Sequence, residues 1–82
     1  MIIRLYEVSE KAKDNLNLFD AIITKSKISG LYSVELECTE VKVLENHIEI
    51  WYIPKFEKYT KEYFSHRNLA VIGKDEFSEL VI

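Results

Sequence analysis

The sequence has one cysteine, one proline and two glycines among its 82 residues. Because Cys38 is alone, no internal disulfide and no cysteine metal site can form, and we predict a buried, unreactive thiol. Gly30 and Gly73 belong to no phosphate-binding motif, so no cofactor is predicted. No apolar run approaches the ~20 residues that cross a bilayer, and the amino end lacks a secretory signal pattern. We therefore expect a cytoplasmic protein with no membrane partner.

What the sequence does contain is typical of a folded globular chain. Hydrophobic residues make up 48% and charged residues 30%, which excludes a disordered or collagen-like chain. A chain of this length forms one domain, and about 60% of its unfolded surface is buried on folding. We therefore predict a single α+β domain over residues 1–82.

The net charge of −3 is unevenly distributed along the chain. Residues 31–53 contain one basic and five acidic side chains, a net charge of −4, whereas residues 54–67 contain four basic and two acidic ones, a net charge of +2. An acidic segment repels phosphate. Residues 31–53 are therefore predicted to favour a basic partner over nucleic acid.

Residues 31–53 are predicted to form a β-hairpin that turns near Glu45 and Asn46. Apolar and polar residues alternate with the period of two that is typical of a strand with one buried face. The phase slips at Thr39 and Glu40, which predicts a β-bulge. The predicted core face contains Val34, Leu36, Cys38, Ile48, Ile50 and Tyr52, and the outward face contains Ser33, Glu35, Glu37, Glu49 and Trp51.

The flanking segments show helical and strand patterns in alternation. Residues 2–8 are β-branched and aromatic, as in a strand, and Ser9 stands at a helix N-cap position. A helical repeat follows, from Ala12 through Leu16 and Phe19 to Ile23, and a second amphipathic helix is predicted after Pro54. Residues 69–72 are predicted to form a strand. The tail, residues 75–82, fits either a helical turn or a strand paired with residues 69–72, and we favour the turn.

This order predicts a two-layer, ferredoxin-like βαββαβ sandwich with an antiparallel sheet and both helices on one face. In that topology the strand of residues 2–8 lies beside the strand ending at Ile53. Tyr6 would then lie near Trp51 on the open face of the sheet, flanked by Glu35, Glu37 and Glu49.

Side chains able to perform catalysis are present but are not grouped in the sequence. His47 lies in a turn and His66 at the end of a predicted helix, with no second histidine or cysteine nearby. Glu35, Glu37 and Glu49 are predicted to face water, where nothing raises a carboxyl pKa. We therefore predict no enzymatic activity and no metal site.

Two family resemblances rest on short stretches. The strand and helix order resembles an RNA-recognition module, with Tyr6 and Trp51 at the place of its stacking aromatics; the strand HIEIWYI lacks that family's basic, glycine-rich motif. The stretches YEVS and YSVELE resemble the small CRISPR-associated adaptation nucleases of ferredoxin-like fold, with Glu7 in place of the catalytic aspartate. The first resemblance implies nucleic-acid binding, and the second implies nuclease activity.

The function predicted from these residues is a small interaction module or inhibitor, of the kind that viruses and mobile elements encode. It would dock on a basic, possibly nucleic-acid-binding, protein through Tyr6, Trp51, Glu35, Glu37 and Glu49. Aromatic anchors supply binding energy and carboxylates steer a cationic partner. Two alternatives stay open: a single-stranded nucleic-acid-binding domain that uses Tyr6 and Trp51 for stacking, and a structural homodimer.

Overall fold

A computed structural model describes residues 1–16, 21–52 and 68–82 of the chain. In these ranges the chain forms seven strands, one short α-helix and one 3-10 helix, which are, in order, β1 (Ile2–Val8), α1 (Glu10–Leu16), β2 (Ile22–Lys25), β3 (Tyr32–Glu37), β4 (Glu40–Val43), β5 (His47–Tyr52), β6 (Asn68–Gly73), η3 (Lys74–Glu76) and β7 (Glu79–Val81).

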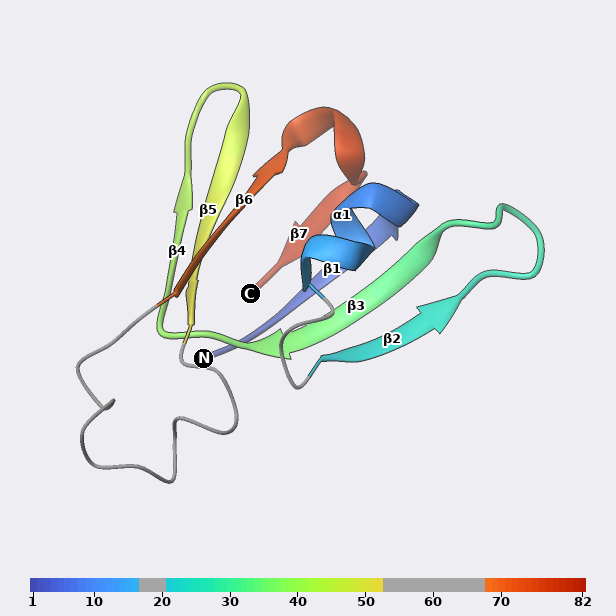
Figure 1. The fold of residues 1–82 in the computed structure, drawn as a ribbon, viewed down its shortest axis with the longest axis horizontal. Coiled ribbons are helices and arrows are strands. Elements are labelled where there is room, and N and C mark those ends of the chain that lie inside the picture. The colour runs from blue at the N-terminus through green and yellow to red at the C-terminus, as the bar shows by residue number, and fades with distance from the viewer. Residues whose placement is uncertain (17–20, 53–67) are drawn as a thin grey trace.

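The strands form two antiparallel sheets (Figure 1). The four-stranded sheet has the order β2-β3-β1-β7, and the three-stranded sheet has the order β4-β5-β6. Every strand pair in both sheets is antiparallel. The chain passes from the four-stranded to the three-stranded sheet between β3 and β4, and it returns to the four-stranded sheet between β6 and β7.

Cys38 and Thr39 form the corner between the two sheets. The Cys38 amide donates to the Met1 carbonyl at 2.9 Å, whereas the next amide, that of Thr39, donates to the Trp51 carbonyl at 2.7 Å. One residue thus pairs with the start of β1 and the next pairs with the end of β5. Strands that switch sheets through a bulge or bend are how packed sheets make corners. The bulge predicted near Thr39 and Glu40 is in fact the point where the chain changes sheets.

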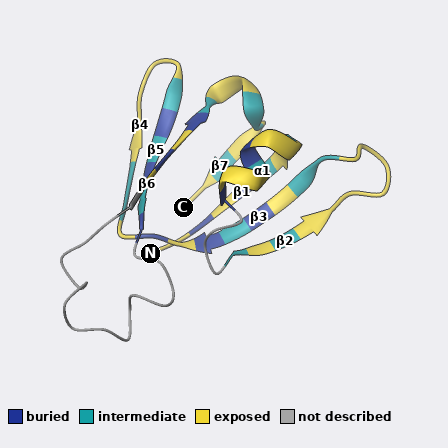
Figure 2. Cartoon of the chain, in the orientation of Figure 1, coloured by how far each residue is buried: buried dark blue, intermediate teal, exposed yellow. Residues whose placement is uncertain are grey.

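A single hydrophobic core lies between the sheets and against α1 (Figure 2). Successive strand residues point to opposite faces, so β1, β3, β5 and β6 contribute alternate side chains to this core, and β2, β4 and β7 each pack one partly buried side chain against it. All six residues predicted for the core face of the hairpin are buried, which confirms that prediction. The buried set is Ile3, Leu5, Val8, Ala12, Leu16, Val34, Leu36, Cys38, Ile48, Ile50, Tyr52, Ala70 and Ile72.

Helix α1 begins where the N-cap prediction placed it. The Ser9 hydroxyl accepts a hydrogen bond from the Ala12 amide at 3.2 Å, and the Ser9 carbonyl accepts one from the Lys13 amide at 2.9 Å. The first bond satisfies one of the amide donors that a helix start leaves unpaired, and the second is the first bond of the helix itself. Ala12 and Leu16 are buried against the core.

The helix predicted from the repeat between Ala12 and Ile23 is too long. The structure ends α1 at Leu16 and places Ile22 and Ile23 in β2, antiparallel to β3. β-Branched side chains favour strands, and Ile22, Ile23 and Thr24 follow one another. Ile23 still packs against the core, so its inward position was correct although its element was wrong. Phe19 lies outside the described residues.

The ferredoxin-like prediction is wrong. Seven strands in two sheets and one short α-helix, counted over the described ranges, are not a two-helix, one-sheet sandwich. The predicted second helix after Pro54 lies outside the described residues. The strand predicted over residues 69–72 is β6. The tail forms η3 and then β7, which pairs with β1 and not with β6.

Candidate functional site

The predicted docking face is divided between the two sheets. Tyr6 lies on β1 and Glu35 and Glu37 lie on β3, neighbouring strands of the four-stranded sheet, whereas Glu49 and Trp51 lie on β5 in the other sheet. Strand β1 pairs with β3 and β7, and β5 pairs with β4 and β6. The expectation that Tyr6 and Trp51 lie side by side is therefore wrong, because it depended on a pairing of β1 with β5.

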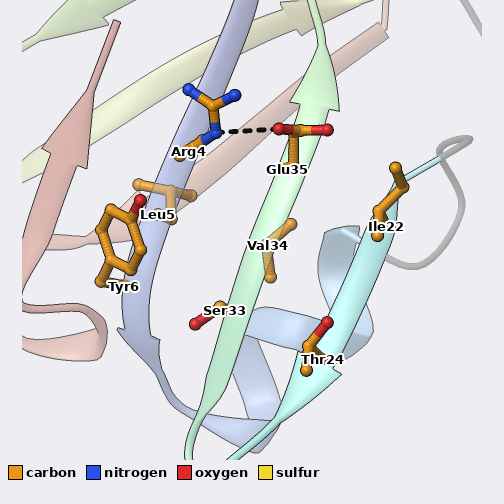
Figure 3. A pocket seen from close by; sticks show the side chains of 8 residues that line it. All are labelled: Arg4, Leu5, Tyr6, Ile22, Thr24, Ser33, Val34 and Glu35. Carbon is orange, nitrogen blue, oxygen red and sulfur yellow. Dashed lines mark hydrogen bonds and ion pairs between the residues drawn. The ribbon is translucent and has the colours of Figure 1, made fainter.

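The outer face of the four-stranded sheet keeps three of the predicted residues together. Arg4 is paired with Glu35 across β1 and β3, and Ile2 is paired with Glu37. The Arg4 Nε donates to Glu35 Oε1 at 2.8 Å (Figure 3). This ion pair is exposed and contributes about 0–1 kcal/mol to stability. It balances the charge of Glu35.

Two hollows lie side by side on this outer face. The first, of about 240 Å³, is lined by the Arg4–Glu35 pair, Tyr6, Ile22, Thr24 and Ser33, among others (Figure 3). The second, of about 380 Å³, is lined by Tyr6 and Ser33 again and also by Glu7, Glu79 and Ser78. Both hollows have Tyr6 and Ser33 among their lining residues, so they adjoin, and together they are here called the acidic groove. Its residues are Arg4, Tyr6, Glu7, Ser33, Glu35 and Glu79.

The strands that pair at the second hollow explain how Glu79 reaches the groove. Tyr6 of β1 and Glu79 of β7 are paired residues, so their side chains lie on the same face. The Ser78 amide donates to the Tyr6 carbonyl at 2.9 Å, and the Ser78 hydroxyl donates to the same oxygen at 3.2 Å. Because Tyr6 and Glu79 are far apart in the sequence, only the pairing of the tail with β1 reveals this part of the site.

Glu7 occupies an unusual backbone position within β1. Its φ is +50°, and the register of β1 against β3 shifts between Leu5 and Val8. A left-handed conformation costs a residue with a Cβ about 1–2 kcal/mol. This bulge places Glu7 at the second hollow, which Glu79 also lines. Glycine would adopt this conformation at a lower cost than glutamate.

Replacing Glu7 by glycine should raise the free energy of unfolding by about 0.5–1 kcal/mol. Glycine adopts positive φ without steric cost, which outweighs its larger loss of backbone entropy. A urea titration of Glu7→Gly against the natural chain measures the difference. Glu7→Ala is the matched control, because it removes the same carboxylate but keeps the Cβ, and it should not be stabilising. Equal stability of the two variants would contradict the strain at this position.

The outer face of the three-stranded sheet holds the other two predicted site residues. Trp51 is paired with Glu40 and with Leu69, and Glu49 is paired with Lys42 and with Val71. Trp51 is half-buried and its indole nitrogen is buried. The indole is therefore partly exposed, and it lies in a different sheet from Glu35 and Glu37, which the prediction placed beside it. Leu69 and Val71, which are exposed, make this face more apolar than expected.

The remaining candidate groups lie away from the acidic groove. Cys38 is buried, and burial raises the pKa of its thiol; the Glu37 carboxylate raises it further, while the amino-terminal ammonium group lowers it. His47 begins β5 in the other sheet, and His66 lies outside the described residues. In the described part of the chain, no three His, Cys, Asp or Glu side chains are grouped so as to hold a metal ion.

Comparison with known proteins adds no assignment to this geometry. No protein-family model, curated protein or solved structure matches the chain. Over the ranges that the structure describes, no helix has the length and apolar composition needed to cross a membrane.

Proposed function

We propose that this protein is a small, non-enzymatic binding module that docks on a basic segment of another protein through the acidic groove. The observation that carries the proposal is the charge of this sheet face. Three carboxylates of the acidic groove, those of Glu7, Glu35 and Glu79, lie there with the guanidinium of Arg4. Since Arg4 pairs with Glu35, the balance of the face is negative.

The shape of the groove also supports an extended polypeptide as the partner. Tyr6 is half-buried between the two hollows, and a tyrosine on rigid backbone is a favourable anchor for a bound chain. Ile22, which is 64% exposed, gives the first hollow an apolar wall. Cationic side chains would lie at the Glu7 and Glu79 end, and an apolar side chain would lie near Ile22.

Nucleic acid fits this face less well. The carboxylates repel phosphate, and Tyr6 and Trp51, the two rings proposed for base stacking, lie on different sheets. An inhibitor of a nucleic-acid-binding protein remains one form of the proposal, because such proteins present basic surfaces.

Binding of a fluorescein-labelled oligolysine peptide, followed by anisotropy at low salt, tests this function. We expect Glu79→Gln combined with Glu7→Gln to weaken binding about tenfold, because each charge that contacts the peptide contributes roughly 0.5–1 kcal/mol. Tyr6→Ala should weaken it similarly.

Glu49→Gln is the matched control for this experiment, since it removes one carboxylate from the other sheet. It should bind oligolysine as the natural chain does, and a labelled oligoglutamate peptide should not bind to either protein. The proposal would be overturned if the natural chain failed to bind oligolysine, or if the groove variants bound as tightly as Glu49→Gln.

A further inference from the structure

The turn between β2 and β3 presents an exposed apolar side chain and two exposed cations. Ile28 is 100% exposed, the highest value among the exposed large hydrophobic residues of the described ranges, and Lys25 and Lys27 beside it are exposed as well. The turn, residues 26–30, extends beyond the body of the four-stranded sheet (Figure 1). We call residues 25–30 the basic tip.

Hydrogen bonds within the turn hold the basic tip in one shape. The Ser26 hydroxyl accepts from the amides of Ile28 and Ser29, each at 3.3 Å, and the Ser26 carbonyl accepts from the Gly30 amide at 3.0 Å. Gly30 adopts the left-handed φ of +73° that closes the turn. A preformed turn loses little conformational entropy on binding. Its side chains are thus ready for contact with another molecule.

The basic tip lies next to the negative end of the acidic groove. Ser26 and Ser29 of the turn line the same hollow as Glu7 and Glu79. The molecule therefore presents a cationic, apolar protrusion and an anionic hollow as neighbours on one surface. A two-fold interface needs a surface patch that is complementary to itself, and a cationic protrusion beside an anionic hollow is such a patch.

We infer that two copies of this chain dock reciprocally, with the basic tip of each copy seated on the acidic groove of the other. Lys27 of one copy meets Glu79 and Glu7 of the second, and Ile28 packs beside the ring of Tyr6. The same contacts occur twice across the axis, so the assembly closes as a dimer. The inference rests on the proposed function, because the dimer covers the carboxylates that would bind a basic partner. Dimer formation and partner binding are then mutually exclusive.

Charge reversal on each side of the contact gives the sharpest test. Lys27→Glu places two like charges across the axis, and Glu79→Lys does the same with the opposite sign. We expect either single variant to lower the dimer association constant at least about tenfold, because each change acts at two contacts. The double variant, with both changes in one chain, restores opposite charges between positions 27 and 79 and should dimerise more strongly than either single variant. An equimolar mixture of the two single variants should also recover the dimer.

Sedimentation equilibrium of the full chain, at protein concentrations up to about 1 mM, measures these constants. The runs compare about 20 mM with about 300 mM salt, since screening weakens contacts between exposed charges. Lys42→Glu, an exposed lysine on β4, is the control and should behave as the natural chain does. A natural chain that stays monomeric at low salt overturns the inference. Single variants that dimerise normally, or a mixture that fails to recover the dimer, overturn it as well.

The Lys27→Glu variant separates this inference from the proposed function. It keeps the acidic groove, so it should bind oligolysine while it fails to dimerise. If every variant, including Lys42→Glu and the double variant, failed to dimerise while oligolysine binding was kept, the error would lie in the reciprocal contact alone. If the natural chain dimerises but Lys27→Glu, whose groove no second copy covers, does not bind oligolysine, the error lies in the proposed function alone.

Discussion

Replacing Ile50 by alanine should lower the free energy of unfolding by about 3 kcal/mol. Ile50 is fully buried at the centre of β5, between β4 and β6, and it faces the core shared by both sheets. Removing three buried carbon atoms costs the transfer free energy of those atoms and leaves a cavity. In a domain of this size such a loss is a large part of the total stability. A urea titration followed by circular dichroism measures it.

Val43→Ala is the control for Ile50→Ala. Val43 lies on β4 in the same sheet but is 57% exposed, so its truncation should cost about 0.5 kcal/mol or less. Similar losses for the two variants would mean that the inner face of this sheet does not form a packed core.

Replacing Thr39 by proline should lower the free energy of unfolding by about 2 kcal/mol. Proline has no amide hydrogen, so the change removes the 2.7 Å bond from the Thr39 amide to the Trp51 carbonyl. The 3.0 Å bond from the Thr39 hydroxyl to the same oxygen is lost as well. Together these bonds tie β5 to the corner between the sheets, and two lost hydrogen bonds of this kind cost about 2 kcal/mol.

Thr39→Val separates the amide from the hydroxyl. It keeps the backbone bond and the β-branched shape, so its cost should stay below about 1 kcal/mol. If Thr39→Pro were as stable as Thr39→Val, the hydrogen bond of the Thr39 amide would not stabilise the corner between the sheets, and this prediction would be wrong.

Local patterns in the sequence predicted local structure well. Alternation of apolar residues identified every buried side chain of β3 and β5, because the period of a strand is set by its own backbone. The Leu44 amide donates to the His47 carbonyl at 2.9 Å, which confirms the turn at Glu45 and Asn46. Ser9 was correct as an N-cap for the same reason: the bond that it makes spans only three residues.

The pairing of distant strands was not predictable from those patterns. Alternation shows which face of a strand is buried but not which strand lies beside it. The phase slip at Thr39 was visible, yet it fits a bulge within one sheet as well as a change of sheet. The run from Ile22 to Thr24 fitted the helical repeat by spacing and a strand by its β-branching, and pairing with β3 decided between them.

The site was predicted in part for the same physical reason. Tyr6, Glu35 and Glu37 were placed correctly on one sheet face, since they lie on strands β1 and β3, each of which was predicted. Glu79 was missed because it joins the face only through the pairing of β7 with β1. Glu7 was missed because strict alternation turns it toward the core, and no feature of the sequence marks its left-handed conformation.

A nuclear magnetic resonance titration of the labelled chain with oligolysine tests the central claim most directly. The claim is that the acidic groove, formed by β1, β3 and β7, receives the basic partner. Backbone amide shifts should then change at Tyr6, Glu7, Ser33 and Glu79 and stay constant at Glu49 and Val71 on the other sheet. Shifts confined to β5 and β6, or no shifts at low salt, would contradict the claim.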